Sequence, residues 1–525
     1  MKRRTLLKGI TAGAIGVGFG LFPRLARAAW GDIDPQVWPA GVTPATKVLE
    51  IYLWGGMAPW ESFYYSSAVG STTRGFDTDV GALVWNTGVC SGTPAGLVTQ
   101  FLANDLNGAG KSIHLGPFAK PLWRTDIAAK IRVVCLYHDL TPHEAAIPYA
   151  LSGQRLGHAD ATGLGAPMQR RARALDVSHT HPLPFSYCML TAFGISQPML
   201  STIDAVGNHP GDSKPITLPI GPGTAAFISN LNRVVPANAD ALLANYSAQY
   251  AARLTRPAAS GPARSRAYQD FASSTAGLAS APQLSTLLTS APLSVTAAQA
   301  CARDAAAFEN GIHLSSTALQ AAAYLLNHPD TTKRANYVCI VDGGLHDAGD
   351  GQLPYDVHDF GDSRGQAMRT GSNLWETLSA LAGIIRAPAD PPSSTKIDLA
   401  DTLIVIKTEF GRTPFRSTGG IPTPASIGRD HWPDGYVGVL IGGPIQAAGV
   451  AGSIGDGTGN MGTQGRADQA TSYQPQDFQA AALLAGGIDP FADGNLPLGN
   501  LSPNLQTGTH TASMINLRQQ ILGVP

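Results

Sequence analysis

Hydrophobic residues along the chain are concentrated in short, nearly continuous runs that are separated by polar and helix-forming segments. Such runs predict buried strands at residues 47–56, 130–139, 183–191, 336–344, 401–411 and 435–443. Two further segments, 372–387 and 475–488, carry apolar residues at helical spacing, with Ser372 as the predicted N-cap of the first. Continuous apolar runs are typical of parallel strands covered on both faces. The pattern therefore predicts an α/β fold, with a mainly parallel sheet flanked by helices on both faces.

The segment between the third and fourth predicted strands has a different composition. Residues 235–330 contain alanine-rich helical stretches, and the part between them, about 257–295, is rich in Ser, Ala and Pro. We therefore expect a mostly helical insertion at 191–335 that lies over the sheet, and a lid is one role for it. With this insertion, residues 29–525 are predicted to form one large α/β domain, two domains being the alternative.

The N-terminus has the pattern of an export signal. Arg3 and Arg4 precede a glycine-rich apolar stretch that is too short to span a bilayer, and Ala26-Arg27-Ala28 fits a small-x-small cleavage site. The paired arginines resemble the twin-arginine (Tat) consensus. We expect residues 1–28 to be a Tat signal peptide, an uncleaved membrane anchor being the alternative. The mature protein would then be periplasmic or secreted, and the Tat export machinery would be a partner.

Removal of this segment makes the chain acidic. Six of the 36 Lys and Arg residues lie within 1–28, which leaves 30 against 37 acidic residues and a net charge of about −7. Proteins that bind nucleic acid usually present a basic surface, so nucleic acid is not an expected partner. No later run of about 18 apolar residues occurs, so no stable membrane span is expected after cleavage. The five cysteines form no CxxC pair, which argues against a zinc ribbon or a dithiol redox site.

Polar residues gather directly after several predicted strands. The range 342–362 holds six aspartates and two histidines, although only 14% of the chain is charged. The carboxyl ends of parallel strands meet at one edge of a sheet, where the sites of such proteins form. We therefore expect this cluster to converge with polar residues that follow other strands, namely Glu61, His138, Asp139, His143, Glu409 and Arg412.

A bound cation would offset the repulsion between the clustered carboxylates. A solvated loop and a calcium site are alternatives, since Gly and Asp favour turns and calcium needs only oxygen ligands. The histidines of the cluster favour a transition metal or magnesium, because calcium does not prefer imidazole. Asp342 with His346 and Asp356 with His358 both have a usable ligand spacing, and the residues alone leave both pairs open. The sequence therefore predicts a divalent metal, with zinc, magnesium, manganese and calcium as candidates.

Several motifs resemble those of one exported family. They are "GGMAPWESFY", "YHDLTPHEAAIPYALSGQRLG", "YDVHDF", "TLIVIKTEFGRTP" and "GRDHWPDGYVGVLIGG", in this order, and they cover about residues 47–170 and 336–490. The family is the one catalogued as domain of unknown function 1501, which looks like a distant branch of the alkaline phosphatase/sulfatase superfamily. The resemblance implies an alkaline-phosphatase-like fold with one or two metal ions at the strand ends.

The same resemblance implies a set of metal ligands. Asp356, His358 and His431 would hold one ion, while Glu61 and Glu409 would bind the same ion or a second one. We therefore expect the metal to be held mainly by side chains that follow the strands of the sheet.

It also implies catalytic roles. Arg412 would bind the anionic group of a substrate and His143 would move a proton, which gives a metal-dependent hydrolase of phosphate or sulfate esters as the expected function. Phe410 stands where the superfamily has a histidine, and no Ser, Thr or Cys nucleophile matches. These departures favour the alternative, a non-catalytic exported binding or assembly protein that retains the fold.

Overall fold

The structure is a computed structural model. It describes residues 33–60, 62–64, 101–102, 113–158, 162–175, 187–192, 216–220, 314–331, 334–342, 355–356, 363–413, 430–455, 465–492 and 496–525, with single positions between 238 and 249. The predicted signal peptide and most of the 191–335 segment lie outside these residues. Within the described part, no helix combines the length and the apolar character needed to cross a membrane.

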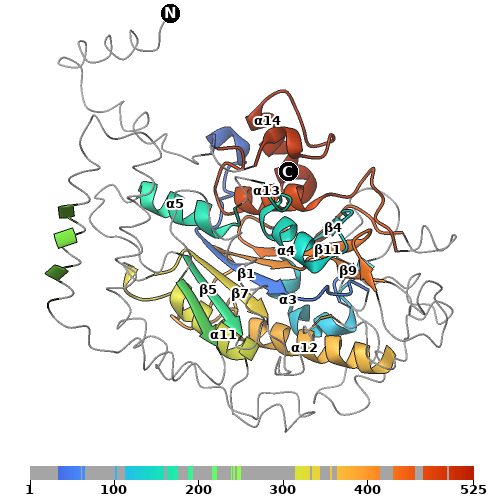
Figure 1. The fold of residues 1–525 in the computed structure, drawn as a ribbon, viewed down its shortest axis with the longest axis horizontal. Helices are drawn as coiled ribbons and strands as arrows, with labels where there is room; N and C mark the ends of the chain where they lie inside the picture. Colours follow the sequence, from blue (N-terminus) through green and yellow to red (C-terminus); the bar gives the residue numbers. More distant parts are fainter. Residues whose placement is uncertain are drawn as a thin grey trace, which may run out of the picture.

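An eight-stranded sheet forms the centre of the described part of the chain, in the order β12-β4-β11-β8-β1-β7-β5-β6 (Figure 1). Its strands are β1 (Lys47–Leu53), β4 (Ile131–Leu136), β5 (Tyr187–Ala192), β6 (Ile216–Ile220), β7 (Tyr337–Asp342), β8 (Thr402–Lys407), β11 (Tyr436–Gly442) and β12 (Gly449–Ala451). All neighbouring strands are parallel except β11, which is antiparallel to both β4 and β8. The predicted strands are all present, and the mainly parallel sheet is confirmed.

Helices cover both faces of this sheet (Figure 1). One face carries η3 (Pro117–Trp123), α3 (Thr125–Ala128), α11 (Leu314–Leu326) and α12 (Ser363–Ile384). The other carries α4 (His143–Ser152), α5 (Gly165–Leu175), α13 (Pro475–Ala485) and the C-terminal α14 (His510–Asn516), with the short η1 (Pro35–Val37), η8 (Leu498–Asn500) and η9 (Leu517–Ile521). The chain is thus a three-layer α/β/α structure, as the pattern of apolar runs predicted.

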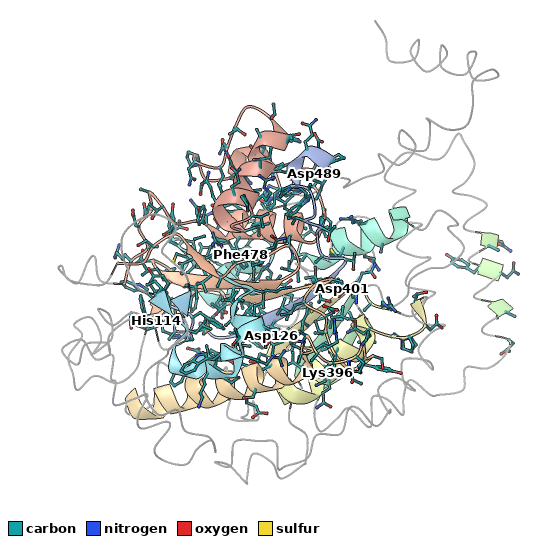
Figure 2. All side chains as sticks on the ribbon, turned by 180° about the vertical axis from the view of Figure 1, so that it is seen from behind. His114, Asp126, Lys396, Asp401, Phe478 and Asp489 are labelled. Carbon is teal, nitrogen blue, oxygen red and sulfur yellow. The ribbon has the colours of Figure 1, made fainter. Side chains whose placement is uncertain are left out.

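Side chains of the strands alternate between these two layers. In β1, Leu49 and Ile51 pack with the α11–α12 layer, whereas Val48 and Tyr52 pack with the α13 layer. Figure 2 shows the side chains that fill both layers, including Phe478 between α13 and the sheet. Because both faces of every central strand are buried, the strands read as continuous apolar runs in the sequence.

Two details of the helices differ from the sequence prediction. The helix predicted to begin at Ser372 begins at Ser363, so Ser372 is an internal residue and its prediction as an N-cap was wrong. The residues that precede 372 lack an apolar stripe, and the pattern therefore hid the first turns of α12. The described end of the predicted insertion, α11, packs against β7 and α12 and belongs to the layer that covers the sheet.

A buried ion pair connects the sheet to the α4–α13 layer. The Lys407 ammonium lies 3.2 Å from Glu50 Oε1, and both side chains are almost completely buried. Lys407 also donates hydrogen bonds to Gln479 Oε1 at 2.5 Å and to the Leu151 carbonyl at 3.4 Å. Burial lowers the pKa of Lys407, while Glu50 opposes this shift. Since α4 carries His143 at its first residue, Lys407 fixes the position of that helix on β8.

Replacing Lys407 by Met should therefore leave the Glu50 carboxylate buried without its cation. We expect Lys407→Met to lower the free energy of unfolding by about 3–5 kcal/mol, measured by urea denaturation. The double variant Glu50→Gln/Lys407→Met should recover part of this loss, because neither charge then remains buried alone. The control Lys130→Met, at a half-buried position, should change stability much less. Equal effects at positions 130 and 407 would contradict the role assigned to the ion pair.

Candidate metal centre

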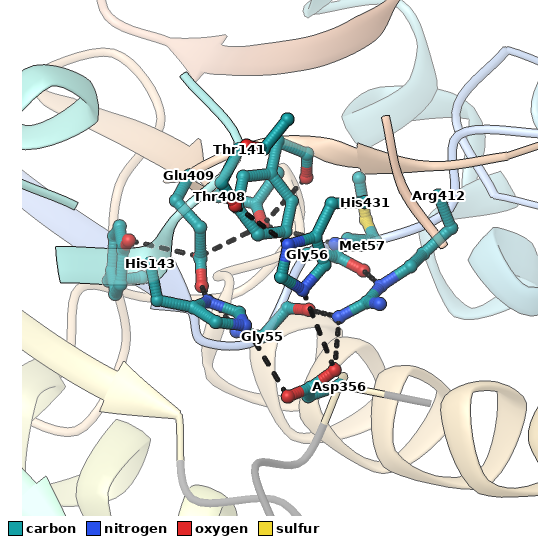
Figure 3. A network of polar contacts seen from close by, with 12 residues as sticks. Gly55, Gly56, Met57, Thr141, His143, Asp356, Thr408, Glu409, Arg412 and His431 are labelled. Atoms are coloured by element: carbon teal, nitrogen blue, oxygen red, sulfur yellow. Dashed lines mark hydrogen bonds and ion pairs between the residues drawn. The ribbon is translucent and has the colours of Figure 1, made fainter. Parts of the chain in front are cut away.

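Five polar side chains meet beyond the carboxyl ends of β1, β4 and β8 (Figure 3). His143 is the first residue of α4, which follows β4, and Glu409 follows β8. Arg412 and His431 lie opposite each other in the two-stranded pair β9 (Gly411–Arg412) and β10 (His431–Trp432). Asp356 comes from the segment after β7. The expected convergence of polar groups at one edge of the sheet thus brings these five side chains together.

The loop that follows β1 contacts the segment that carries Glu409 and Arg412 through hydrogen bonds. The Met57 N–H donates to Thr408 Oγ1 at 3.0 Å, and the Trp60 indole N–H donates to the Arg412 carbonyl at 3.0 Å. Gly55 and Gly56 have φ angles of 117° and 92°, in a region that L side chains rarely adopt. The "WGGM" turn therefore lets the backbone approach Asp356 and Arg412 closely.

Glu409 is completely buried, and its carboxylate accepts several hydrogen bonds (Figure 3). Oε1 accepts from the Gly55 N–H at 2.9 Å and from His143 Nδ1 at 2.8 Å, while Oε2 accepts from the Tyr52 hydroxyl at 3.0 Å. Burial, together with the nearby Glu409, raises the pKa of Tyr52, so this phenol stays protonated and donates. A buried carboxylate needs such partners, because leaving it without them costs several kcal/mol.

The two histidines of the group point the same nitrogen towards Asp356. His143 Nε2 lies 3.3 Å from Asp356 Oδ2, and His431 Nε2 lies 3.9 Å from Asp356 Oδ1. The His431 Nδ1–H donates to the Thr141 carbonyl at 2.7 Å, which leaves its Nε2 as the nitrogen with a lone pair. Phe410 packs against both rings, with centroids 4.9 Å from His143 and 4.2 Å from His431. The rings are therefore held by packing as well as by hydrogen bonds.

Arg412 holds Asp356, the carboxylate that both histidines face. Its Nη2 donates to Asp356 Oδ1 at 2.6 Å and to the Gly55 carbonyl, and its Nε donates to the Gly56 carbonyl at 3.1 Å. The Arg412 side chain is 0% exposed, whereas that of Asp356 is 23% exposed. The Arg412 guanidinium thus pairs with Asp356, and its predicted contact with a substrate anion stays a prediction.

His143, Asp356 and His431 together offer ligand atoms that all lie within 4.8 Å of one another. Among the described residues, this is the group of His, Cys, Asp and Glu side chains whose spacing could hold a metal ion. Two imidazoles and one carboxylate suit zinc and other transition metals better than calcium or magnesium, which prefer oxygen ligands. The candidate centre is therefore a two-histidine, one-carboxylate site.

The remaining predicted residues fall into two groups. Glu61, His346 and His358 lie outside the described residues. Asp342 is described and completely buried, and its Oδ2 accepts hydrogen bonds from the Tyr355 hydroxyl at 2.6 Å and from Thr377 Oγ1 at 2.7 Å. Of the two alternative aspartates, Asp356 is the one that lies with the histidines.

The structure also gives His138 a definite part in the site. The Leu140 N–H donates to its Nδ1 at 3.0 Å, so its Nε2–H donates to the Glu409 carbonyl at 2.7 Å. Burial lowers the pKa of His138 to about 4, and this histidine is neutral near pH 7. His138 thus fixes the backbone that carries Glu409.

The sequence predicts proton transfer for His143 but does not predict its place beside Asp356 and His431. It also does not predict Tyr52 and Gly55 as partners of Glu409, since Tyr52 lies within an apolar run. A useful signal was available in "GG" directly after the first strand, because paired glycines there allow a close backbone approach.

Fold and site together define an α/β protein with a two-histidine, one-carboxylate cluster at the carboxyl edge of a mainly parallel sheet. Residues 396–493 match the family model described as "Protein of unknown function (DUF1501)", which confirms the family predicted from the motifs. This segment contains Glu409, Arg412 and His431. Comparisons with curated proteins and with solved structures gave no match.

The approach of Gly55 to Asp356 can be tested by adding a single methyl group. A Cβ at Gly55 would meet the Asp356 backbone nitrogen at 2.3 Å, whereas a Cβ at Gly41, which also has a positive φ, would meet nothing within 4 Å. Both Ala variants should lose about 1–2 kcal/mol of stability from backbone strain, and Gly55→Ala should lose more, because its Cβ would also clash with the backbone of Tyr355 and Asp356. Only Gly55→Ala should also displace Asp356 and weaken metal binding, measured by titration with Zn²⁺. Equal metal affinities in the two variants would show that this contact does not position Asp356.

The protonation of His143 should make the metal-free protein sensitive to pH. Burial alone lowers the pKa of His143, but Asp356 and Glu409 raise it to about 9. A folded-state pKa above the unfolded value contributes stability that is complete below about pH 6.5 and is lost as the pH rises through 9. In the presence of a chelator, the free energy of unfolding should therefore fall by up to about 3 kcal/mol between pH 6 and pH 10. His143→Gln should flatten this part of the profile, and an unchanged slope would contradict the assignment.

Proposed function

We propose that the protein is a metal-dependent hydrolase in which His143, Asp356 and His431 hold one divalent transition metal. The observation that carries this proposal is the placement of two imidazole nitrogens around one carboxylate at the carboxyl edge of the sheet. Catalytic zinc sites commonly use three protein ligands and leave a position open for water or substrate. His358 and Glu61 remain predicted as additional ligands.

The charges of the site favour an anionic substrate. Glu409 and Asp356 are acidic, and Arg412 supplies one positive charge. A divalent ion on neutral histidines would give the group a net positive charge, which attracts an anionic group. A phosphate or sulfate ester, the substrate class implied by the family resemblance and the proposed alkaline-phosphatase-like fold, fits this requirement.

Bound at this position, a divalent ion would supply Lewis acidity, which polarises an ester oxygen and lowers the pKa of water. The protein's own groups would fix the geometry of the site. Arg412 holds Asp356 by a charged hydrogen bond, and Glu409 orients the His143 ring. Phe410 packs against the rings of His143 and His431 and limits their movement. Since no side-chain nucleophile matches the superfamily pattern, the proposal is a direct attack by water.

Export fits a protein of this kind. The Tat pathway carries folded proteins, so the metal would be bound before the chain crosses the membrane, and the mature enzyme would act in the periplasm or outside the cell. The paired Arg3 and Arg4 are the observation that supports this part of the proposal.

A non-catalytic exported binding or assembly protein is the second candidate. Phe410, which stands where the superfamily has a metal-binding histidine, favours it: the ring is buried and packs on His143 and His431, where it adds no ligand. In such a protein the metal would serve structure or binding.

Metal analysis combined with ester hydrolysis separates these functions. Purified protein should contain about one transition metal ion per chain and hydrolyse an aryl phosphate or an aryl sulfate. His431→Ala should lose the metal and lower kcat/KM at least about 100-fold, because one of three ligands is gone. The control His510→Ala, at an exposed position in α14, should keep both properties.

Two results would contradict the hydrolase. Protein that takes up no Zn²⁺, Mn²⁺ or Co²⁺ would remove its metal site. Protein that binds one ion but hydrolyses neither ester would favour the binding or assembly protein instead.

A further inference from the structure

We infer that Glu409 is a positioning residue, which acts on the metal through His143 and is not itself a ligand. This inference rests on the metal site of the proposed function and deepens it, because it separates the two carboxylates of the cluster. Asp356 would touch the ion. Glu409 would set the orientation and the electron density of the imidazole that touches the ion.

The hydrogen bonds of Glu409 support this division. Its oxygens already accept from Tyr52, Gly55 and His143, and the side chain is 0% exposed. Asp356 lies on the open side of the His143 ring, with its side chain 23% exposed. A metal placed between His143 Nε2 and Asp356 would therefore have the imidazole ring between itself and Glu409.

The state of the His143 ring follows from the same contacts. The Glu409 carboxylate accepts a hydrogen bond from Nδ1, so Nδ1 carries the proton and the lone pair of the neutral ring lies on Nε2. The Nε2 atom is buried, and it has no well-directed hydrogen bond among the described residues. Asp356 Oδ2, 3.3 Å away, pairs with this nitrogen when the ring is protonated, and a metal ion can take the place of the proton when the ring is neutral.

His431 shows the same arrangement with a different acceptor. Its Nδ1 donates to the Thr141 carbonyl at 2.7 Å, and its Nε2 faces Asp356. Metal-binding histidines commonly donate the proton of their second nitrogen to a carboxylate or a carbonyl, which fixes the ring and raises its basicity. The two histidines thus use the two usual acceptors, and the charged one, Glu409, has the stronger effect on basicity.

Tyr52 extends this line of contacts into the sheet. Its hydroxyl donates to Glu409 Oε2 and therefore fixes the plane of the carboxylate that accepts the hydrogen bond from His143 Nδ1. Removing the hydroxyl should have a smaller effect in the same direction as neutralising Glu409, because the Gly55 N–H still holds Oε1.

Cobalt substitution tests the inference, since the visible spectrum of Co²⁺ reports its ligands. Glu409→Gln should weaken Co²⁺ binding about 10–100-fold, while one ion is still bound and the positions and intensities of the visible bands are kept. Tyr52→Phe should weaken binding less, with the same spectrum. The control Glu376→Gln, at another buried carboxylate, which lies on α12 in the opposite helical layer, should leave the affinity for Co²⁺ unchanged.

A second measurement reports which ring nitrogen of each histidine carries the proton. In the zinc-loaded protein, ¹⁵N NMR of the histidines should show Nδ1 protonated and Nε2 metal-bound for both His143 and His431. Glu409→Gln should change the Nδ1 signal of His143 and leave that of His431, a selectivity that general loosening of the site would not produce.

The possible failures are distinguishable. A changed cobalt spectrum in Glu409→Gln would make Glu409 a ligand, and an unchanged affinity would remove its role altogether; both outcomes overturn the inference while leaving the hydrolase intact. Wild-type protein that binds Co²⁺ with the expected Glu409 effects but hydrolyses no ester would overturn the proposed hydrolase and support the inference. Wild-type protein that binds no Co²⁺ or Zn²⁺ would overturn both.

Discussion

The structure at the edge of the sheet depends on compensating two carboxylates, Glu409 and Asp356, that the fold removes largely from water. Each has its own cationic or donor partner: Arg412 holds Asp356, while Tyr52 and the Gly55 backbone hold Glu409. His143 lies between the two, with one ring nitrogen towards each carboxylate. Removing any of these partners would leave a charge in a poorly hydrated place, which costs more than an ordinary lost hydrogen bond. The loop after β1, the start of α4 and the β9–β10 pair each supply one of these partners.

The sheet supplies what the loops alone lack, a rigid base for side chains that lie far apart in the sequence. Parallel strands bring β1 and β8 to a common edge, and the β9–β10 pair then places Arg412 opposite His431. Below the site, Lys407 ties β8 to α4 and α13, so the helix that begins with His143 is fixed at its other end as well. The segment that matches the DUF1501 family, residues 396–493, contributes Glu409, Arg412 and His431 but neither His143 nor Asp356. The site is therefore complete only when earlier parts of the chain fold onto that segment.

Much of the fold could be predicted from the sequence, because buried strands must be apolar on both faces and this leaves a visible pattern. The antiparallel direction of β11 could not, since an apolar run has no direction, and neither could β6, whose run contains Pro219, or the three-residue β12. Position after a strand was enough to nominate Glu409, Arg412 and His143, which share one edge. Their partners were less accessible: whether His143 meets Asp356 depends on the relative placement of α4 and the segment after β7, and no local spacing in the sequence encodes that distance.

The charge of the site would link the binding of a metal ion at the candidate centre to the protonation of His143. With His143 neutral, the carboxylates Glu409 and Asp356 outweigh the single cation Arg412, and the cluster lacks one positive charge. A proton on His143 can supply this charge, and so can a metal ion that binds Nε2 beside Asp356. Both need the same nitrogen lone pair, so they exclude each other. A divalent ion also brings one charge more than the proton does, and that surplus is what would make the loaded site attractive to an anion while the metal-free site is not. The same few contacts would thus determine the stability of the empty protein and the ligand preference of the loaded one.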